Sequence, residues 1–313
     1  MCGVTFEPLT GGVSSDIWKV TAGGEVFCVK RALSKLKVEA DWHAPIERNL
    51  YEVAWYRTAN EKVPGSAPRI LAHDETLMLC AMEYLDPDSH KLWKSELRDG
   101  RADPEQARLA GERLGCIHAE TADDAVWERF PRTDIFYDIR LEPYLEATAA
   151  RHPDLKDRLH GLSRRTAETR LAMIHGDVSP KNILLGPDGP VFLDAECACI
   201  GYPAFDIAFC LNHFLLKCLW TPSATDGFLT CFQAMSAAYL AEVDWEARDD
   251  VEARAASLLP GLFLARVDGK SPVEYITDEA DKDKVRQCAR TLLLEPPSRL
   301  TDVADAWAEE LLK

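Results

Sequence analysis

The sequence Ile174-His175-Gly176-Asp177-Val178-Ser179-Pro180-Lys181-Asn182, followed by Phe192-Leu193-Asp194, decides how this 313-residue chain is interpreted. It places an aspartate five residues before an asparagine, and a second aspartate after a short turn. Transfer of a phosphoryl group needs a carboxylate that orients and deprotonates the attacking hydroxyl, and oxygen ligands that hold Mg²⁺ against the phosphates. The residue types and their spacing therefore favour a phosphoryl-transfer site, with Asp177 as the catalytic residue and Asn182 and Asp194 as metal ligands.

The segment between these residues predicts a β-hairpin that brings the three side chains together. Ile183–Leu185 and Val191–Leu193 are short runs of branched and aromatic residues, and Gly186–Pro190 is a dense turn signal. In the simplest register residue 183 pairs with 193 and residue 185 with 191, so Asn182 and Asp194 face each other. Each residue alone is a common turn former, so the prediction depends on the whole set in this order.

The composition is that of an ordinary globular protein. Hydrophobic residues make up 47% of the chain and charged residues 28%, and the net charge is −16. This charge argues against nucleic acid or an anionic membrane surface as a partner, and it is compatible with a cationic small substrate. An acidic protein kept soluble by its charge would have the same composition, so the charge alone selects no substrate.

The ten cysteines favour reduced thiols in a cytoplasmic protein. Several lie within apolar runs, no C-x-x-C occurs, and Met1–Pro8 lacks the basic and apolar regions of a signal peptide. The most apolar long segment, from Phe205 to Trp220, contains four polar or charged residues. We therefore expect a buried helix there and not a membrane span. No feature of the sequence fixes the oligomeric state.

The chain changes character near residue 85. Before it, strand patterns such as Ile17–Val20 and Val26–Val29 flank the Gly23-Gly24 turn, and one helical pattern runs from Ile46 to Glu61. After it the patterns are mostly helical, starting at Asp103-Pro104 with an aspartate cap and a proline in the first turn. Further strands are expected at 69–73 and 77–83, and further helices at 142–149, 154–169, 203–219, 227–241, 251–266, 281–293 and 301–312. We predict an α+β, bilobal chain with a small antiparallel-sheet N-terminal lobe (1–85), a larger mainly helical C-terminal lobe (86–313) and a hinge near 83–88.

With these lobes and motifs, the chain resembles the aminoglycoside phosphotransferase and choline kinase-like family, which has a protein-kinase-like fold. The resemblance runs from residue 8 to residue 220 and is strongest at 174–208. It implies that Asp177 orients or deprotonates the acceptor hydroxyl, and that Asp206 braces the catalytic loop. Asp194 is followed by Ala195-Glu196, as in many small-molecule kinases, and not by the Phe-Gly of protein kinases.

The resemblance also assigns residues to the nucleotide. Lys30, at the end of the strand Phe27–Val29, takes the place of the lysine that holds the α- and β-phosphates. Glu52 is its predicted ion-pair partner because it follows Arg48 in the family's R-x-x-x-E spacing, and Glu47 is the competing candidate.

Two further segments match parts of the family's nucleotide site by position. Leu9–Asp16 takes the place of the loop that covers the phosphates, and Met82–Leu85 takes the place of the hinge that binds adenine. The loop lacks G-x-G-x-x-G, but its glycines and hydroxyl residues offer donors to phosphate oxygens. The residues assigned to the nucleotide in these segments are Gly11, Gly12, Ser14, Ser15, Glu83 and Leu85.

The sequence therefore predicts an ATP- and Mg²⁺-dependent kinase that phosphorylates a hydroxyl of a small molecule, such as an aminoglycoside, a sugar or an amino alcohol. The alternative is a nucleotide-binding pseudokinase or regulatory module without turnover. Such proteins usually lose the base, a metal ligand or the lysine, and all of these are present here.

The sequence does not identify the acceptor, although the C-terminal lobe is expected to line its pocket. The candidate substrate residues are Glu196, Asn212, His213, Trp220, Arg266 and Asp268. Arg266 and Asp268 can instead form an ion pair at a helix terminus. If Arg266 reaches the pocket, an acceptor with a carboxylate or several hydroxyls is favoured over a pure polycation.

Overall fold

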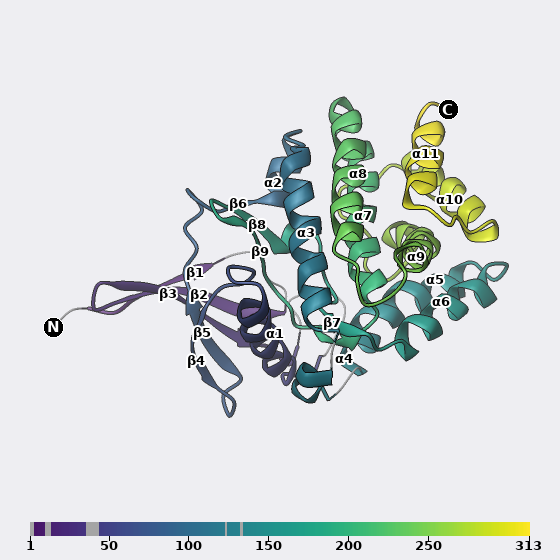
Figure 1. Ribbon diagram of the computed structural model, residues 1–313. Helices are drawn as coiled ribbons and strands as arrows, with labels where there is room; N and C mark the ends of the chain where they lie inside the picture. Colours follow the sequence, from purple (N-terminus) through teal and green to yellow (C-terminus); the bar gives the residue numbers. More distant parts are fainter. Residues whose placement is uncertain (1–2, 10–13, 36–43, 123, 132–133) are drawn as a thin grey trace.

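The computed structural model describes residues 3–9, 14–35, 44–122, 124–131 and 134–313 (Figure 1). Within these ranges a five-stranded antiparallel sheet and the helix α1 (Arg48–Lys62) form the N-terminal part, and helices form most of the remainder. The predicted α+β fold, with an antiparallel N-terminal sheet and a mainly helical C-terminal region, is confirmed. The domain boundary at residue 85 stays a prediction.

The N-terminal sheet places Lys30 in its interior. The strand order is β1 (Thr5–Leu9), β2 (Ser15–Ala22), β3 (Glu25–Ala32), β5 (Leu79–Glu83) and β4 (Ile70–Asp74). The β2–β3 hairpin turns at Gly23 and Gly24, whose φ angles of 62° and 89° favour glycine. Lys30 of β3 pairs with Cys80 of β5, and its side chain is buried. Figure 1 shows α1 beside this sheet, on the side that faces the helical region.

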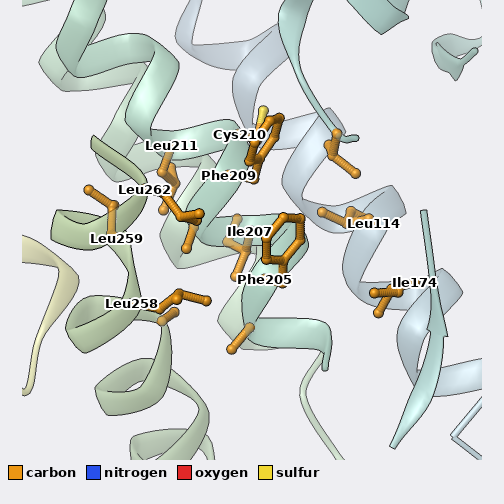
Figure 2. Close-up of a cluster of buried hydrophobic side chains, with 14 of the residues drawn as sticks. Leu114, Ile174, Phe205, Ile207, Phe209, Cys210, Leu211, Leu258, Leu259 and Leu262 are labelled. Atoms are coloured by element: carbon orange, nitrogen blue, oxygen red, sulfur yellow. The ribbon is translucent and has the colours of Figure 1, made fainter. Parts of the chain in front are cut away.

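The helical region is built around α7 (Pro203–Trp220), which is buried nearly all round. It packs between α3 (Pro104–Glu120), α8 (Thr225–Ala241) and α9 (Arg248–Asp268), while α10 (Glu279–Leu294) and α11 (Leu300–Leu311) cover α9 at the C-terminal end (Figure 1). Figure 2 shows Phe205 and Ile207 of α7 between Leu258 of α9 and Leu114 of α3. As predicted, Asp103 caps α3 by accepting the Glu105 N–H.

Shorter elements surround the loop that carries Asp177. Two small sheets pair β7 (Ala172–Ile174) with β10 (Cys199–Gly201), and β8 (Ile183–Gly186) with both β6 (Lys91–Leu92) and β9 (Gly189–Phe192). The remaining elements are α2 (Trp93–Arg98), the 3₁₀ turns η1 (Asp124–Arg129), η3 (Pro180–Asn182) and η4 (Pro222–Ala224), α4 (Asp134–Phe136), the π-helix η2 (Tyr137–Glu146), α5 (Ala147–Arg151) and α6 (Lys156–Glu168). No sequence pattern predicted β6, β7, β10 or α2, and the helix predicted at 142–149 is observed as the end of the π-helix and the start of α5.

The predicted register of the β8–β9 hairpin is wrong by one residue. Ile183 pairs with Phe192, and Gly186 pairs with Gly189. The physical reason is a tighter turn than expected, because only residues 187 and 188 connect the strands and Gly189 takes a φ of 105°. The Leu193 N–H donates to the Asn182 carbonyl oxygen at 2.8 Å, which keeps residues 182 and 194 at the same end of the hairpin.

The described ranges contain no helix that is both long and apolar enough to cross a membrane. The nine cysteines within these ranges are free, and all but Cys116 are buried.

Candidate active site

Lys30 lies in a buried cluster of charges where the sheet meets the helical region. Its Nζ lies 2.7 Å from Glu52 Oε1 of α1, 2.6 Å from Asp194 Oδ1 and 3.1 Å from Glu196 Oε1. The Lys30–Glu52 ion pair is therefore formed as predicted, whereas the competing Glu47 is exposed.

Three carboxylates share this single ammonium group, so the cluster carries excess negative charge. Burial acts to lower the pKa of Lys30, but Asp194, Glu196 and Glu52 outweigh it and raise this pKa well above its usual value. Burial also raises the pKa of Glu52, against the effect of Lys30 and with the support of the other two carboxylates. This imbalance suits a cation bound beside Asp194, which is the most exposed of the three acids.

Glu196 belongs to this cluster, and the structure does not place it among the candidate acceptor residues. Its Oε1 accepts hydrogen bonds from the hydroxyls of Ser15 at 2.6 Å and Ser14 at 3.1 Å, and its Oε2 accepts one from Arg48 Nε at 2.8 Å. The Arg48 guanidinium also donates to the carbonyl oxygens of Ala44, Pro45, Ser14 and Leu33. Arg48 and Glu196 thus connect α1, the end of the segment predicted to cover the phosphates and the chain after Asp194.

The nucleotide-contact roles predicted in the N-terminal part are not tested by this geometry. Gly11 and Gly12 lie outside the described residues, and Ser14 and Ser15 contact Glu196. Their phosphate contacts therefore remain predictions.

The predicted adenine-binding hinge follows β5. The Glu83 N–H donates to the Arg69 carbonyl oxygen at 2.9 Å, and Glu83 Oε1 accepts the Arg69 N–H at 2.9 Å. Leu85 lies two residues beyond, in the connection to the helical region. The roles of Glu83 and Leu85 in binding adenine remain predictions.

Asp177 lies in a tight loop after β7 that the surrounding structure fixes. Gly176 has a φ of 77°, and a Cβ atom there would lie 2.7 Å from the Cys197 Cβ, so only glycine fits. Asp206, in the first turn of α7, accepts the backbone N–H groups of His175 at 2.7 Å and Gly176 at 2.8 Å. The predicted bracing of this loop by Asp206 is therefore seen directly.

The two carboxylate oxygens of Asp177 have different surroundings. Oδ2 lies 2.7 Å from Arg140 Nη2 and 3.1 Å from Lys181 Nζ, and it accepts a hydrogen bond of 2.8 Å from Asn182 Nδ2. Oδ1 has no such partner among the described residues. Burial acts to raise the pKa of Asp177, but Arg140 and Lys181 outweigh it and hold this pKa below its usual value. The site therefore contains an ionised carboxylate, fixed through one oxygen and open at the other.

Asn182 and Asp194 each keep an oxygen that could bind a metal. Asn182 uses its Nδ2 for the backbone oxygen and Oδ2 of Asp177, which leaves its Oδ1. Asp194 uses Oδ1 for Lys30, which leaves its Oδ2. Its φ of 66° is rare for a residue other than glycine, and its N–H donates to the Tyr56 hydroxyl at 2.7 Å. Amide and carboxylate oxygens are hard ligands that fit Mg²⁺.

A small cavity lies next to the loop that carries Asp177. Pro180 and Lys181 of the loop line it, together with Lys94, His213, Lys217, Arg266, Val273, Glu274 and Tyr275. His213 and Arg266, two of the predicted acceptor residues, are thus brought together next to Asp177. Trp220 lies beside the cavity, where its ring stacks on Tyr275 with centroids 4.2 Å apart.

Asn212 and Asp268 do not line this cavity. Asn212 is fully buried within α7 and donates to the Phe209 carbonyl oxygen. Asp268 accepts two hydrogen bonds of 2.9 Å from Arg286 of α10, and it lies 2.8 Å from the His152 ring. The ion pair considered between Arg266 and Asp268 is also replaced, because Asp268 pairs with a different arginine. Asp268 therefore joins α9 to α10 in a structural role.

Sequence reasoning missed two cations that shape the site. Arg140 lies in the π-helix η2, and its Nε donates to the Gly176 carbonyl oxygen at 2.9 Å. No local pattern predicts that contact. The sequence did contain a signal for Lys217, because it is the one lysine or arginine in a buried, mostly apolar helix.

Comparison with known proteins agrees with this geometry. The sequence model of the phosphotransferase enzyme family matches residues 5–251. The methylthioribose kinase of Pectobacterium atrosepticum is 26% identical over 309 residues, covering 84% of this chain and 76% of the relative. The methylthioribose kinase of Pectobacterium carotovorum subsp. carotovorum is 27% identical with the same coverage.

Solved structures of low sequence identity share the fold. The amicoumacin kinase hAmiN in complex with AMP-PNP, Ca²⁺ and Ami superposes with a TM-score of 0.57 at 14% identity, covering 95% of this chain and 89% of that one. A choline/ethanolamine kinase family protein from Mesorhizobium loti gives a TM-score of 0.56 at 17% identity, covering 97% and 92%. The chain therefore belongs to the phosphotransferase enzyme family and is a kinase-like phosphotransferase of small molecules.

Proposed function

We propose that this chain is an ATP- and Mg²⁺-dependent kinase that transfers the γ-phosphoryl group to a hydroxyl of a small molecule. The observation that carries the proposal is the Asp177 carboxylate, which is held through Oδ2, has no partner at Oδ1 among the described residues, and contacts Lys181 at the edge of a cavity. The family, the kinase names of the relatives and the AMP-PNP bound by amicoumacin kinase support a nucleotide as donor. The predicted cytoplasmic location is part of this proposal.

Each side chain of the site then has a defined task. Lys30, held by Glu52, binds the phosphates, and the free oxygens of Asn182 and Asp194 hold Mg²⁺. The metal, when bound, neutralises charge that develops on the phosphates. Asp177 Oδ1 accepts the hydrogen bond of the acceptor hydroxyl and aligns that oxygen with the γ-phosphorus.

The proton and electrons balance in a single displacement. The acceptor oxygen forms a bond to the γ-phosphorus, the bond from that phosphorus to the β–γ bridging oxygen breaks, and ADP leaves with the electron pair. The hydroxyl proton passes to Asp177. Because neighbouring cations keep the pKa of Asp177 low, we expect orientation to contribute more than strong basicity, with proton transfer late in a loose transition state.

Replacement of Asp177 by Asn tests this function. The amide cannot accept the proton, so ADP release driven by an acceptor should fall by about 100- to 10,000-fold. Binding of AMP-PNP with Mg²⁺, followed as a rise in melting temperature, should stay within error of wild type because the Lys30 cluster is intact. Asp188→Asn, at the exposed tip of the β8–β9 hairpin, is the matched control.

Turnover by Asp177→Asn near the wild-type rate would refute the assignment of Asp177. Wild-type protein that binds nucleotide but releases no ADP with any aminoglycoside, sugar, amino alcohol or hydroxy acid would favour the pseudokinase.

A further inference from the structure

The cavity beside the Asp177 loop is lined by more cationic than anionic side chains, although the whole chain carries a net charge of −16. Its lining includes Lys94, Lys181, Lys217 and Arg266 but only one carboxylate, that of Glu274. Glu274 is already paired with Lys94, at 2.5 Å, and Lys181 is paired with Asp177. Lys217 and Arg266 have no carboxylate partner among the described residues.

Lys217 is the most unusual of these cations. Its side chain is 1% exposed, and its Nζ lies 4.6 Å from the ring centroid of Trp220 and 5.0 Å from that of Tyr275. It forms no hydrogen bond or ion pair with any described residue. An ammonium group has three donors, and aromatic faces compensate only part of the cost of burying it. Burial and the neighbouring Lys94 lower its pKa to about 7.

Arg266 offers a second unused donor. Its Nη1 donates to the Tyr144 hydroxyl at 2.8 Å and to the backbone oxygen of Ser271, which fixes one end of the guanidinium. Its Nε is buried without a hydrogen-bond partner in the described part of the chain. A planar guanidinium held in this way is prepared to bind a carboxylate or phosphate with its remaining donors.

The size of the cavity limits what it can take. Its volume is about 30 Å³, and a cavity needs roughly 10–15 Å³ by the same measure to hold one water molecule. There is room for a small charged group but not for a whole acceptor. The rest of the acceptor must then lie over the Pro180–Lys181 edge, which leads toward Asp177.

We propose that the acceptor is an anion, and that its carboxylate or phosphate ester binds between Lys217 and Arg266 while its hydroxyl faces Asp177. This inference rests on the proposed kinase function and specifies its substrate class. The net charge of the chain selected no substrate, and Arg266 in the cavity meets the condition under which the sequence favoured an acceptor with a carboxylate.

Binding of paired probes tests the inference without turnover. In the presence of saturating AMP-PNP and Mg²⁺, melting temperatures are measured against D-gluconate with sorbitol as its neutral counterpart, and against ribose 5-phosphate with ribose. We expect a saturable rise with at least one anion and none with the neutral compounds. The gluconate and ribose 5-phosphate arms tell a carboxylate from a phosphate ester.

Lys217→Met should weaken the response to the effective anion by about 10- to 100-fold, because a charge-assisted hydrogen bond is lost. Lys217→Arg should retain most of it. Lys270→Met, which removes an exposed lysine paired with Glu142 outside the cavity, is the matched control and should respond as wild type does.

The ligand-free proteins provide a second readout. Removing an unpaired buried cation should leave the melting temperature of Lys217→Met equal to or above that of wild type, as happens when a residue kept for binding is replaced. A purely structural ammonium would instead make the variant less stable.

The outcomes separate this inference from the proposed function. No response of wild type to either anion, or an equal response of wild type and Lys217→Met, would overturn the anionic subsite. If ADP is released with sorbitol, ribose or glucosamine and Lys217→Met leaves that release unchanged, the kinase function is supported and the anionic subsite is overturned. If an anion binds in a way that depends on Lys217 but no acceptor leads to ADP release, the anionic subsite is supported and the kinase function is contradicted.

Discussion

At the scale of single residues, Asp177 shows how one carboxylate can be both fixed and available. Arg140, Lys181 and Asn182 all contact Oδ2, so Oδ1 is the oxygen left for a substrate hydroxyl. The same neighbours keep the carboxylate ionised. Arg140 also holds the Gly176 carbonyl oxygen, so we expect it to act as a positioning residue for Asp177.

Arg140→Met should lower kcat by about 10- to 100-fold through misplacement of Asp177. It should also move the acidic limb of the pH–rate profile to higher pH. Arg140 holds the pKa of Asp177 down, so its removal raises that pKa and Asp177 becomes protonated at a higher pH. The measurement is kcat against pH, with Arg140→Lys as the conservative variant. A lower kcat with an unmoved acidic limb would show that Arg140 acts only on the fold.

The sequence predicted those contacts of the candidate site whose residues are close in the chain or fixed by a motif. Asp177, Asn182 and the Lys30–Glu52 pair belong to this group. Arg140 and Lys217 were missed because their roles depend on packing of distant segments, which no local spacing records. Asp268 was misplaced for the same reason, since its partner Arg286 lies on another helix.

At the scale of elements, the loop after β7 is fixed by contacts with the segment before β10 and with the start of α7. Gly176 turns the chain in a conformation that favours glycine, directly against Cys197 in the segment that leads to β10. Asp206 at the start of α7 then receives the two N–H groups that the turn exposes. The Asp177 carboxylate is placed by a helix start, a two-stranded sheet and a glycine, all of which are buried.

Gly176→Ala should lower the free energy of unfolding by about 1–3 kcal/mol, because it forces a left-handed conformation and a close approach to Cys197. Gly161→Ala is the contrasting control. It lies inside α6, a Cβ atom there would meet nothing within 4 Å, and alanine should add about 0.5–1 kcal/mol. Urea unfolding of both variants measures the difference. Equal midpoints would show that the turn at Gly176 is not required.

Elements with strong local signals were predicted, and those held by tertiary contacts were not. The aspartate cap and proline of α3 and the paired glycines of the β2–β3 hairpin are local signals, and both elements are present. β7 and β10 are three residues each and exist because they pair with each other. The π-helix contains Pro143, and no hydrophobic period distinguishes it from an α-helix.

At the scale of the whole molecule, the buried charges join the two halves of the chain. Arg48 of α1 is fully buried and binds Glu196, whose carboxylate also receives Ser14 and Ser15. Burial acts to raise the pKa of Glu196, but Lys30 and Arg48 contribute to holding it below its usual value. The ionised form is thus the stable one. Its contribution to stability is present at neutral pH and is lost as the pH falls through this lowered pKa.

Arg48→Met should cost about 3–5 kcal/mol of unfolding free energy, because it leaves a buried carboxylate without its partner. Glu196→Gln should relieve part of this cost, so the double variant should be more stable than the sum of the single effects allows. Urea unfolding across this double-mutant cycle measures the coupling. Arg98→Met, which breaks an exposed pair with Asp99, should leave the midpoint unchanged. Strict additivity of Arg48→Met and Glu196→Gln would exclude a shared network.

The stacked rings of Trp220 and Tyr275 offer a fluorescence signal for the cavity in which we propose that the acceptor binds. Their centroids lie 4.2 Å apart, and the Lys217 Nζ lies 4.6 Å from the Trp220 centroid and 5.0 Å from the Tyr275 centroid. Any occupant that pairs with Lys217 changes the charge felt by this indole. The fluorescence of Trp220 should therefore change when the pocket is filled. It is obtained as the difference between the wild-type protein and Trp220→Phe, which removes the signal of the other seven tryptophans.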